Sequence, residues 1–291
     1  METRMGNSTI EGRLQPIPMT RTYSPLPFRM AMLSCLLLLG GTLALSGPSR
    51  GAQRPPRRPP PARPSPEAAA VAVPFRSGEG LTFRILWSKF SVNAGKVDLS
   101  VVERRDFFGR VAWHFQAIAH SMDTMRIVYA LDDQFDSYTD AAQLTSLQYE
   151  MYLHEQGKQQ NSSWRMSTAD NPSLPANIAI AQVLPGTRDP IGLLYALRAA
   201  DWKRAPEFRA PVFDGHNLYE VVARLEQSSG EVMVPAGQFV ASCISVRVLQ
   251  RGKDLESTHF SLWLAQNAAH TPVLIEAEIP FGTARIELTA Q

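Results

Sequence analysis

The side chains best suited to chemistry in this 291-residue sequence are six histidines and several groups of carboxylates. His114 and His120 share one face of a strand-like stretch, on the side opposite its main apolar residues. Their separation along a strand is roughly 20 Å, which is too far for both to ligate one metal ion. His154 and His216 lie next to turn signals and are expected to be exposed polar residues. The histidines therefore predict no metal site.

A cluster of aspartates is the strongest candidate for cation binding: Asp132, Asp133, Asp136 and Asp140. Carboxylate oxygens at this spacing could hold Ca²⁺. The segment lacks the glycine and the closing glutamate of an EF-hand loop. We therefore expect a solvated turn and no bound metal ion.

Paired glutamates and arginines within apolar runs are the remaining polar candidates. Glu276 and Glu278 lie on one strand face, and Glu287 could pair nearby. Carboxylates about 5–9 Å apart could perform glycosidase chemistry, but a polar sheet face is the favoured explanation. An arginine in such a run could neutralise an anionic headgroup if it pointed inward, or protect the sheet from aggregation if it pointed outward. The outward orientation is favoured for the arginines of this kind, Arg84, Arg126, Arg247 and Arg285.

Sequence motifs of the common enzyme classes are absent. The chain has no nucleophile elbow, no phosphate-binding loop, no dinucleotide-binding glycine run and no H-E-x-x-H zinc motif. We therefore predict no catalytic residue and no cofactor, and an enzyme is the least supported of the functions considered.

Large aromatic residues are the best candidates for ligand binding. In a wide barrel they could line a cavity for an apolar or lipid-like ligand. In a closed sandwich the same residues would be core. The predicted ligand-binding residues are Trp87, Trp113, Phe115, Tyr149, Trp164 and Trp263.

Strands must position these side chains, because apolar residues recur at every second position beyond Pro74. The clearest stretches are 81–87, 97–101 and 111–119. Such alternation is typical of strands with one buried face. About a dozen strands are predicted along residues 75–291.

Turn signals separate the predicted strands. Asp214-Gly215 is the strongest hairpin signal, and Gly157 marks another reversal. Val92–Gly95, Asp106–Gly109 and Ser229-Gly230 are also predicted as turns. Hairpins between neighbouring strands indicate an antiparallel sheet.

One helix is clearly predicted, near residues 189–199. Asp189 can cap it, and Pro190 suits its first position. A shorter helix is predicted over Thr124–Tyr129, and Asn171–Gly186 is predicted as a loop joining two β halves. The predicted fold class is all-β and mainly antiparallel: a large barrel, a half-barrel or a sandwich.

The first 74 residues differ from this domain. The apolar run Met30–Leu45 has the length of a signal peptide and is shorter than a membrane-spanning helix. Residues 1–46 are predicted as a leader, either cleaved after Ser46 or kept as an anchor, with Met19 an alternative start. Residues 47–74 are predicted as a disordered Pro/Arg-rich linker, since proline at this density forms an extended spacer. Membrane contact is expected only through an uncleaved leader.

Charge and cysteine content restrict the domain further. Residues 1–74 carry nine Arg and three Glu, so the remaining 20 Lys/Arg and 24 Asp/Glu give residues 75–291 a net charge of −4. A mildly acidic domain gives no reason to expect nucleic-acid binding. Cys35 would leave with the leader, and Cys243 is predicted to be a buried core thiol.

Several short segments, in order and spacing, resemble the domain of unknown function 3108 family over nearly all of residues 75–291. The resemblance implies an exported, mainly β protein and supplies no activity and no catalytic residues. Family members tend to carry an acidic and then a basic residue where this chain has Ala265–His270, so an ion pair there is lost. The segments are Phe75–Phe83 before Ala94-Gly95, Asp189-Pro190 before Leu194–Arg198, Phe213–Gly215 before Leu218-Tyr219, Pro235–Gly237 before Cys243, and Leu262–Leu264 before Thr271–Val273.

Together these features predict an exported protein of the periplasm or cell envelope. The first hypothesis is a binding protein that holds an apolar or lipid-like ligand in a β cavity. The alternative is a structural or scaffolding module that binds an envelope protein and no small molecule. The curvature of the sheet decides between them, because a cavity of at least about 300 Å³ is needed for a ligand of that kind.

Overall fold

A computed structural model of the chain describes residues 72–87, 92–169, 172–173, 177–255, 258–279 and 282–291. The predictions for the leader and for most of the linker lie outside these residues. No helix within the described ranges is both long enough and apolar enough to cross a membrane.

Alternating apolar residues produce strands with one buried face, as predicted. In β1, Leu81, Phe83 and Ile85 are buried, whereas the residues between them are half-buried. The described elements are β1 (Gly80–Trp87), β2 (Val92–Phe107), β3 (Arg110–Ser121), α2 (Asp123–Val128), β4 (Asp132–Asp140), β5 (Ser146–Glu155), β6 (Lys158–Ser167), β7 (Ala179–Gln182), α3 (Pro190–Ala199), β8 (Glu207–Phe213), β9 (Leu218–Val234), β10 (Gly237–Gln250), β11 (Lys253–Asp254), β12 (Phe260–Ala265), β13 (Pro272–Ile279) and β14 (Gly282–Ala290).

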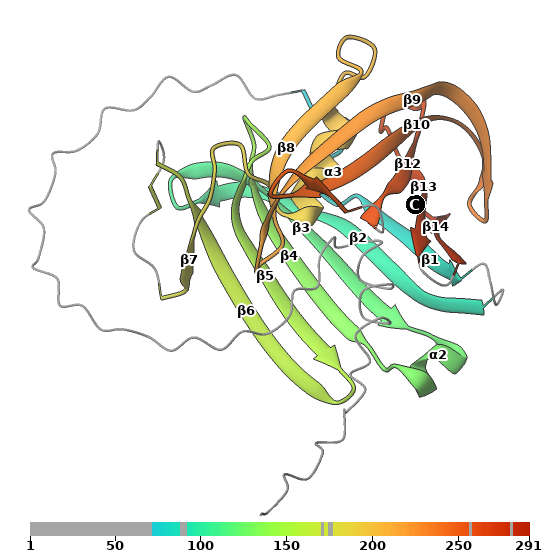
Figure 1. Ribbon diagram of the computed structural model, residues 1–291, viewed down its shortest axis with the longest axis horizontal. Coiled ribbons are helices and arrows are strands. Elements are labelled where there is room, and N and C mark those ends of the chain that lie inside the picture. Colours follow the sequence, from blue (N-terminus) through green and yellow to red (C-terminus); the bar gives the residue numbers. More distant parts are fainter. Residues whose placement is uncertain (1–71, 88–91, 170–171, 174–176, 256–257, 280–281) are drawn as a thin grey trace, which may run out of the picture.

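All the strands belong to one sheet, in the order β7-β6-β5-β4-β3-β2-β1-β14-β13-β12-β10-β9-β8, with β11 paired to β10. The first and last strands of the domain, β1 and β14, pair at its middle and join the two halves. Pairing is antiparallel except between β6 and β7, which are parallel. The all-β, mainly antiparallel fold class is therefore confirmed, with a single strongly curved sheet (Figure 1).

Helix α3 fills the concave side of this sheet (Figure 1). Asp189 caps it by accepting a hydrogen bond from the Gly192 amide, and Pro190 occupies its first turn, as predicted. The Tyr195 ring stacks on Phe115 of β3, with ring centroids 3.7 Å apart. Nearly all of α3 is buried, so the helix is part of the hydrophobic core.

The long β9–β10 hairpin arches over the second half of the sheet (Figure 1). We call its outer part, residues 230–241, the arm. The arm returns to the sheet at its tip, where the Ala236 amide donates a hydrogen bond to the Leu288 carbonyl of β14 at 3.0 Å. Strands β9, β10, β12, β13 and β14 therefore enclose a small barrel-like unit.

Most predicted turns are confirmed, and two are wrong. Asp214-Gly215 connects β8 to β9, and Phe108-Gly109 connects β2 to β3. Ser229-Gly230 lies inside β9, at a break in register with β10 that indicates a bulge. Val92–Gly95 already belongs to β2. Turn-forming residues at a bulge or a strand start give the same local signal as a turn.

The remaining predictions concern α2 and the segment before α3. The short helix predicted near Thr124–Tyr129 is confirmed as α2. The predicted loop Asn171–Gly186 contains the short strand β7, which pairs with β6.

Candidate functional site

A polar groove of about 540 Å³ opens in the small barrel-like unit. Its volume falls within the range of about 300–1,000 Å³ that is typical of ligand sites. The side chains that line it come from five strands and from the residue before β12: Glu226, Ser245, Val246, Arg247, His259, Phe260, Ser261, Glu276, Glu278, Thr283 and Arg285.

Strand register brings the polar residues of this groove to one face. Ser245 pairs with Ser261, Ser261 with Glu276, and Glu276 with Arg285. Paired residues of an antiparallel sheet point to the same side, so these four form one row across β10, β12, β13 and β14. The next residue along each of these strands points to the opposite side of the sheet. Leu262, Ile275 and Ile286 lie on that side, beneath α3.

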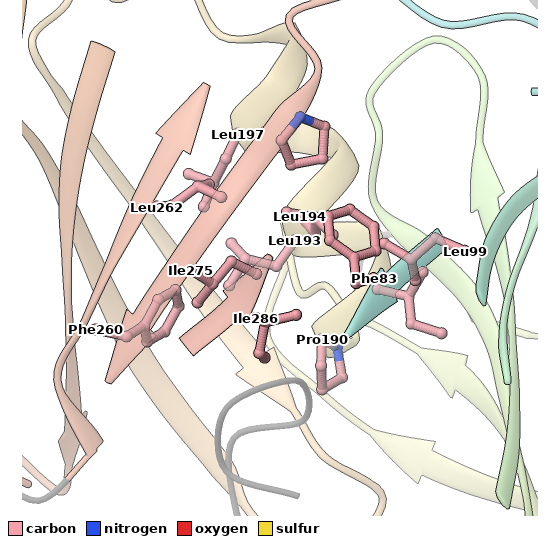
Figure 2. A pocket seen from close by; sticks show the side chains of 12 residues that line it. Phe83, Leu99, Pro190, Leu193, Leu194, Leu197, Phe260, Leu262, Ile275 and Ile286 are labelled. Atoms are coloured by element: carbon pink, nitrogen blue, oxygen red, sulfur yellow. The ribbon is translucent and has the colours of Figure 1, made fainter. Parts of the chain in front are cut away.

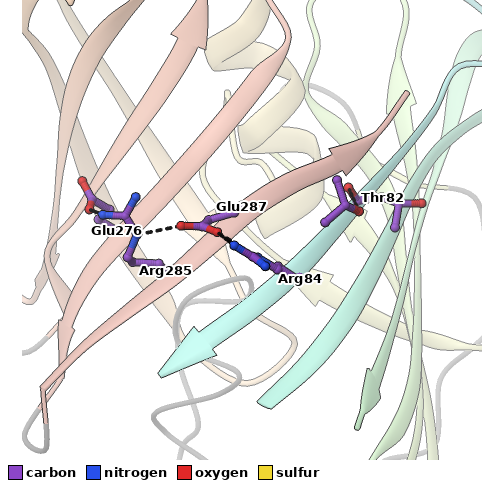
Figure 3. Close-up of polar contacts among 6 residues, drawn as sticks. Thr82, Arg84, Glu276, Arg285 and Glu287 are labelled. Atoms are coloured by element: carbon purple, nitrogen blue, oxygen red, sulfur yellow. Dashed lines mark hydrogen bonds and ion pairs between the residues drawn. The ribbon is translucent and has the colours of Figure 1, made fainter. Parts of the chain in front are cut away.

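An ion-pair chain crosses the floor of the groove and continues into β1 (Figure 3). Arg285 contacts Glu276 at 2.6 Å and Glu287 at 2.9 Å, and Arg84 contacts the second oxygen of Glu287 at 2.7 Å. Glu287 is buried and engages guanidinium groups through both oxygens. It therefore anchors the two arginines. Arg84 and Arg285 thus point away from α3, and Arg285 lines the groove instead of an open sheet face.

A second polar cluster lies at the β10–β12 side. Arg247 and His259 both contact Asp254 of β11, the histidine at 2.6 Å. The hydrogen bond from His259, followed by that from Arg247, lowers the pKa of Asp254. Arg247 and His259 thus both have a carboxylate of the protein as their partner.

Two glutamates of the groove have no arginine partner among the described residues. Glu278 accepts a hydrogen bond from Thr283 at 3.0 Å, and Glu226 makes no hydrogen bond or ion pair within the described part of the chain. Arg247 and Arg285 are already paired with carboxylates, so they do not neutralise these two glutamates. The groove therefore carries negative charge that a ligand could contact. This charge suits a ligand that carries amino or hydroxyl groups.

Cys243 lies on the groove face of β10. Burial raises the pKa of its thiol, with smaller contributions in the same direction from Glu226 and Glu276. A raised pKa disfavours the reactive thiolate. The prediction of a buried core thiol is confirmed.

The concave side of the sheet offers far less space. An apolar cavity between α3 and the sheet measures about 40 Å³ (Figure 2). This volume is close to that of one water molecule and well below that of a lipid-like ligand. Its lining comes from α3 and the sheet: Phe83, Leu99, Pro190, Ile191, Leu193, Leu194, Leu197, Phe260, Leu262, Pro272, Ile275 and Ile286.

Comparison with known families now identifies the domain. Residues 82–289 match the family described as "Protein of unknown function (DUF3108)". This chain belongs to the DUF3108 family. The resemblance found from its short sequence segments is therefore confirmed, and no curated protein matches the chain.

Three of the solved structures that resemble this chain are the following. A beta-barrel-like protein of domain of unknown function DUF1849 from Brucella abortus has a TM-score of 0.46 and 9% identity, covering 72% of this chain and 94% of its own. A candidate exported protein with a YmcC-like fold from Bacteroides fragilis has a TM-score of 0.33 and 11% identity, with coverages of 76% and 98%. A candidate lipoprotein from Parabacteroides distasonis has a TM-score of 0.34 and 10% identity, with coverages of 75% and 97%.

None of the six aromatic residues predicted to bind a ligand lines the polar groove or the apolar cavity of this DUF3108 chain. Trp113 and Phe115 are buried beside Tyr195 of α3, and Phe75 packs edge-on against all three rings. Trp87 is half-buried at the end of β1. Trp113 and Phe115 therefore contribute to the packing around α3.

The other three aromatic residues lie farther apart. Tyr149 is fully buried, and burial raises its pKa. Trp164 packs edge-on against Phe213, with centroids 6.0 Å apart, beside the β8–β9 turn. Trp263 is half-buried on the groove face of β12, and its indole Nε1 has no partner within the described residues. Of the six, only Trp263 shares a strand face with the groove.

The acidic cluster is a strand and not a solvated turn, which corrects the prediction. Its four aspartates lie in β4, where Asp133, Asp136 and Asp140 are buried. Asp136 contacts His114 at 2.6 Å and Asp132 contacts His120 at 2.8 Å. No group of three or more metal-ligating side chains occurs among the described residues.

The turn that departs from the DUF3108 pattern holds the end of α3. Arg198 donates to the Ala269 carbonyl at 2.9 Å, and its own carbonyl contacts His270 at 2.7 Å. Backbone and histidine contacts thus secure this turn in place of the ion pair that the family pattern suggests.

Sequence analysis singled out Glu276, Glu278 and Arg285 but missed Glu226 and the groove hydroxyls. The missed residues are ordinary polar positions of strands. Predicting that they lie in one groove would have required the register between β10, β12 and β13, which the sequence does not give.

Proposed function

We propose that this protein acts after export, in the cell envelope, as a binding protein whose ligand is a polar molecule bearing amino or hydroxyl groups. The signal-length apolar run Met30–Leu45 and the proline-rich spacer support export. The groove, in the mouth of a barrel-like unit, supports binding, because such mouths are common ligand sites.

The observation that carries this proposal is a pair of glutamates without arginine partners, in a groove large enough for a ligand. Glu226 and Glu278 face about 540 Å³ of space, while Arg247 and Arg285 are already bound to carboxylates. Serine and threonine hydroxyls and the Phe260 ring complete the lining. Polar groups around one aromatic ring suit a polar ligand better than the lipid-like ligand expected from the aromatic residues.

Native mass spectrometry of the protein purified from its own envelope tests the proposal. We expect a retained mass that is lost when Glu226→Gln and Glu278→Gln are combined. The control is Glu231→Gln, an exposed position on the same strand β9, which should retain the mass. Absence of a retained mass, or equal retention in both variants, would contradict the groove as the binding site.

The alternative, a scaffolding module, is favoured by one observation. The outer face of the arm exposes Met233 and Val240, which are 74% and 51% accessible. Exposed apolar residues beside each other commonly mark a protein contact. Under this alternative, Met233→Glu with Val240→Glu would abolish co-purification of an envelope protein, whereas the groove variants would not.

A further inference from the structure

A separate cavity of about 250 Å³ lies at the other half of the sheet, where the tip of the β2–β3 hairpin meets β5 and β6. It shares no residue with the polar groove. Its lining combines two arginines with aromatic and apolar groups: Phe107, Phe108, Arg110, Leu147, Arg165, Met166, Pro172 and Ser173.

Arg165 is the central feature of this cavity. The side chain is buried, with 8% of the residue accessible. Its Nε and Nη2 donate to the amide oxygen of Gln148, at 3.2 and 2.8 Å. Among the described residues it has no carboxylate within ion-pair distance, and its Nη1 makes no hydrogen bond. The Gln148 amide in turn donates to Glu150, which acts on Arg165 without touching it. A buried guanidinium that contacts no carboxylate directly is costly unless an anion completes its contacts.

The hairpin tip places an aromatic ring on this guanidinium. Phe108 lies 3.8 Å from the Arg165 guanidinium, measured to the ring centroid, and Phe107 lies 5.7 Å away. Phe108 adopts φ 54°, a left-handed conformation that is strained for a bulky residue. The residue that lies over Arg165 is therefore the one whose backbone is strained.

The remaining lining suits an anion attached to an apolar group. Arg110 also lines the cavity, but Asp140 already pairs with it at 2.7 Å, so Arg165 is the cation available to a ligand. The Ser173 hydroxyl is buried and has no partner within the described residues, so it is free to donate. Leu147 and Met166 provide an apolar wall.

We propose that this cavity binds a phosphate or carboxylate group carried on an apolar chain, with Arg165 as the anion-binding residue. Arginine suits this role because its planar fork donates two parallel hydrogen bonds to such groups. The volume accommodates the anionic group and the start of the chain, and the rest of the chain extends past Phe108. The proposal does not depend on the polar groove.

Calorimetric titration of the full chain below micelle-forming concentrations tests it. We expect dodecyl phosphate to bind with one-to-one stoichiometry. Inorganic phosphate should bind more weakly, and dodecyltrimethylammonium should not bind to the Glu226→Gln, Glu278→Gln double variant, in which the acidic groove cannot attract it. No saturable binding of dodecyl phosphate, or equal binding of the ammonium compound, would overturn the proposal. If inorganic phosphate bound with equal affinity, the proposal that the ligand carries an apolar chain would be wrong.

Two variants identify the residues responsible. Arg165→Met should weaken dodecyl phosphate binding about tenfold or more. Phe108→Gly removes the ring and relieves the left-handed strain, so it should weaken binding while raising the melting temperature. Arg209→Gln, an exposed arginine in β8, is the control and should bind as the parent does. Undiminished binding in both cavity variants would overturn the assignment.

Discussion

Gly192 lies in the first turn of α3, against β4 and β5, and it shows how tightly the helix start is packed. A Cβ at this position would lie 2.8 Å from Ser146 Oγ and 3.0 Å from Thr139 Oγ1. Ser146 cannot move away easily, because its hydroxyl donates to Asp189 and accepts from the Asp189 amide. The glycine is therefore required by the hydrogen-bonded N-cap.

Gly192→Ala should destabilise the protein by about 1–3 kcal/mol, the usual cost of overpacking, despite the better helix propensity of alanine. Gly80→Ala is the matched control, since nothing lies within 4 Å of a Cβ built there. Denaturant unfolding of both variants measures the difference. Equal stabilities would show that Ser146 and Thr139 can move to make room for a Cβ, despite the hydrogen bonds between Ser146 and Asp189.

The end of α3 depends on one buried ion pair. Arg198 is almost inaccessible and contacts Glu79 through two nitrogens, at 2.6 and 3.0 Å. Glu79→Gln should cost about 3–5 kcal/mol, because it leaves a buried guanidinium without its counter-charge. Glu220→Gln breaks the exposed contact with Arg209 and should leave stability nearly unchanged, because solvent screens such a pair. Similar losses in the two variants would argue against a structural role for the buried pair.

At the scale of elements, the β3–β4 pair and α2 share a polar cluster that makes stability depend on pH. The hydrogen bond from Arg126 of α2 is the main cause that lowers the pKa of Asp132 from 3.8 to about 2, with His120 contributing. The folded state therefore binds this proton less readily than the unfolded chain. The contribution of Asp132 to stability is present above about pH 4 and is lost as the pH falls toward 2.

Thermal unfolding between pH 5 and pH 2.5 checks this dependence. The melting temperature of the parent should fall more steeply with acid than that of Asp132→Asn, which cannot titrate at this position. Asp98→Asn, on the neighbouring strand β2, should show a smaller effect, since its pKa is lowered less strongly. Parallel curves for the parent and Asp132→Asn would contradict the assigned cause.

Local chemistry explains which elements could be predicted from the sequence. The start of α3 follows from Asp189-Pro190, and the β8–β9 hairpin follows from Asp214-Gly215, because these residues determine the backbone within a few positions. Ser229-Gly230 misled the prediction, since a bulge in a long strand uses the same residues as a turn.

The candidate site was only partly predictable for a related reason. Alternation alone places Glu276 and Glu278 on a polar face. The meeting of Glu226 with these residues depends on the pairing of β9, β10, β12 and β13 and on the curvature of the sheet. Both are non-local properties, and neither leaves a pattern in a single strand.

At the scale of the whole molecule, the two halves of the chain are parts of one structure. The β1–β14 pairing joins them through the middle of the sheet. Helix α3 follows the first seven strands in sequence but packs on β3 and β4 as well as on β8. Neither half can bury its concave face without the other, so the domain should unfold as one cooperative unit.

Tryptophans report on both halves, because Trp113 and Trp164 lie in the first and Trp263 lies in the second. Single-tryptophan variants unfolded in denaturant should therefore share one midpoint, which should also match that from far-UV circular dichroism. Ile286→Ala, at the buried β1–β14 junction, should lower this midpoint for every probe, in line with a loss of about 2–5 kcal/mol. Ile180→Ala, an exposed position on the edge strand β7, should leave it nearly unchanged. If Ile286→Ala shifted only the signal of the second half, the two halves would be separate folding units, and the continuous sheet would not couple them.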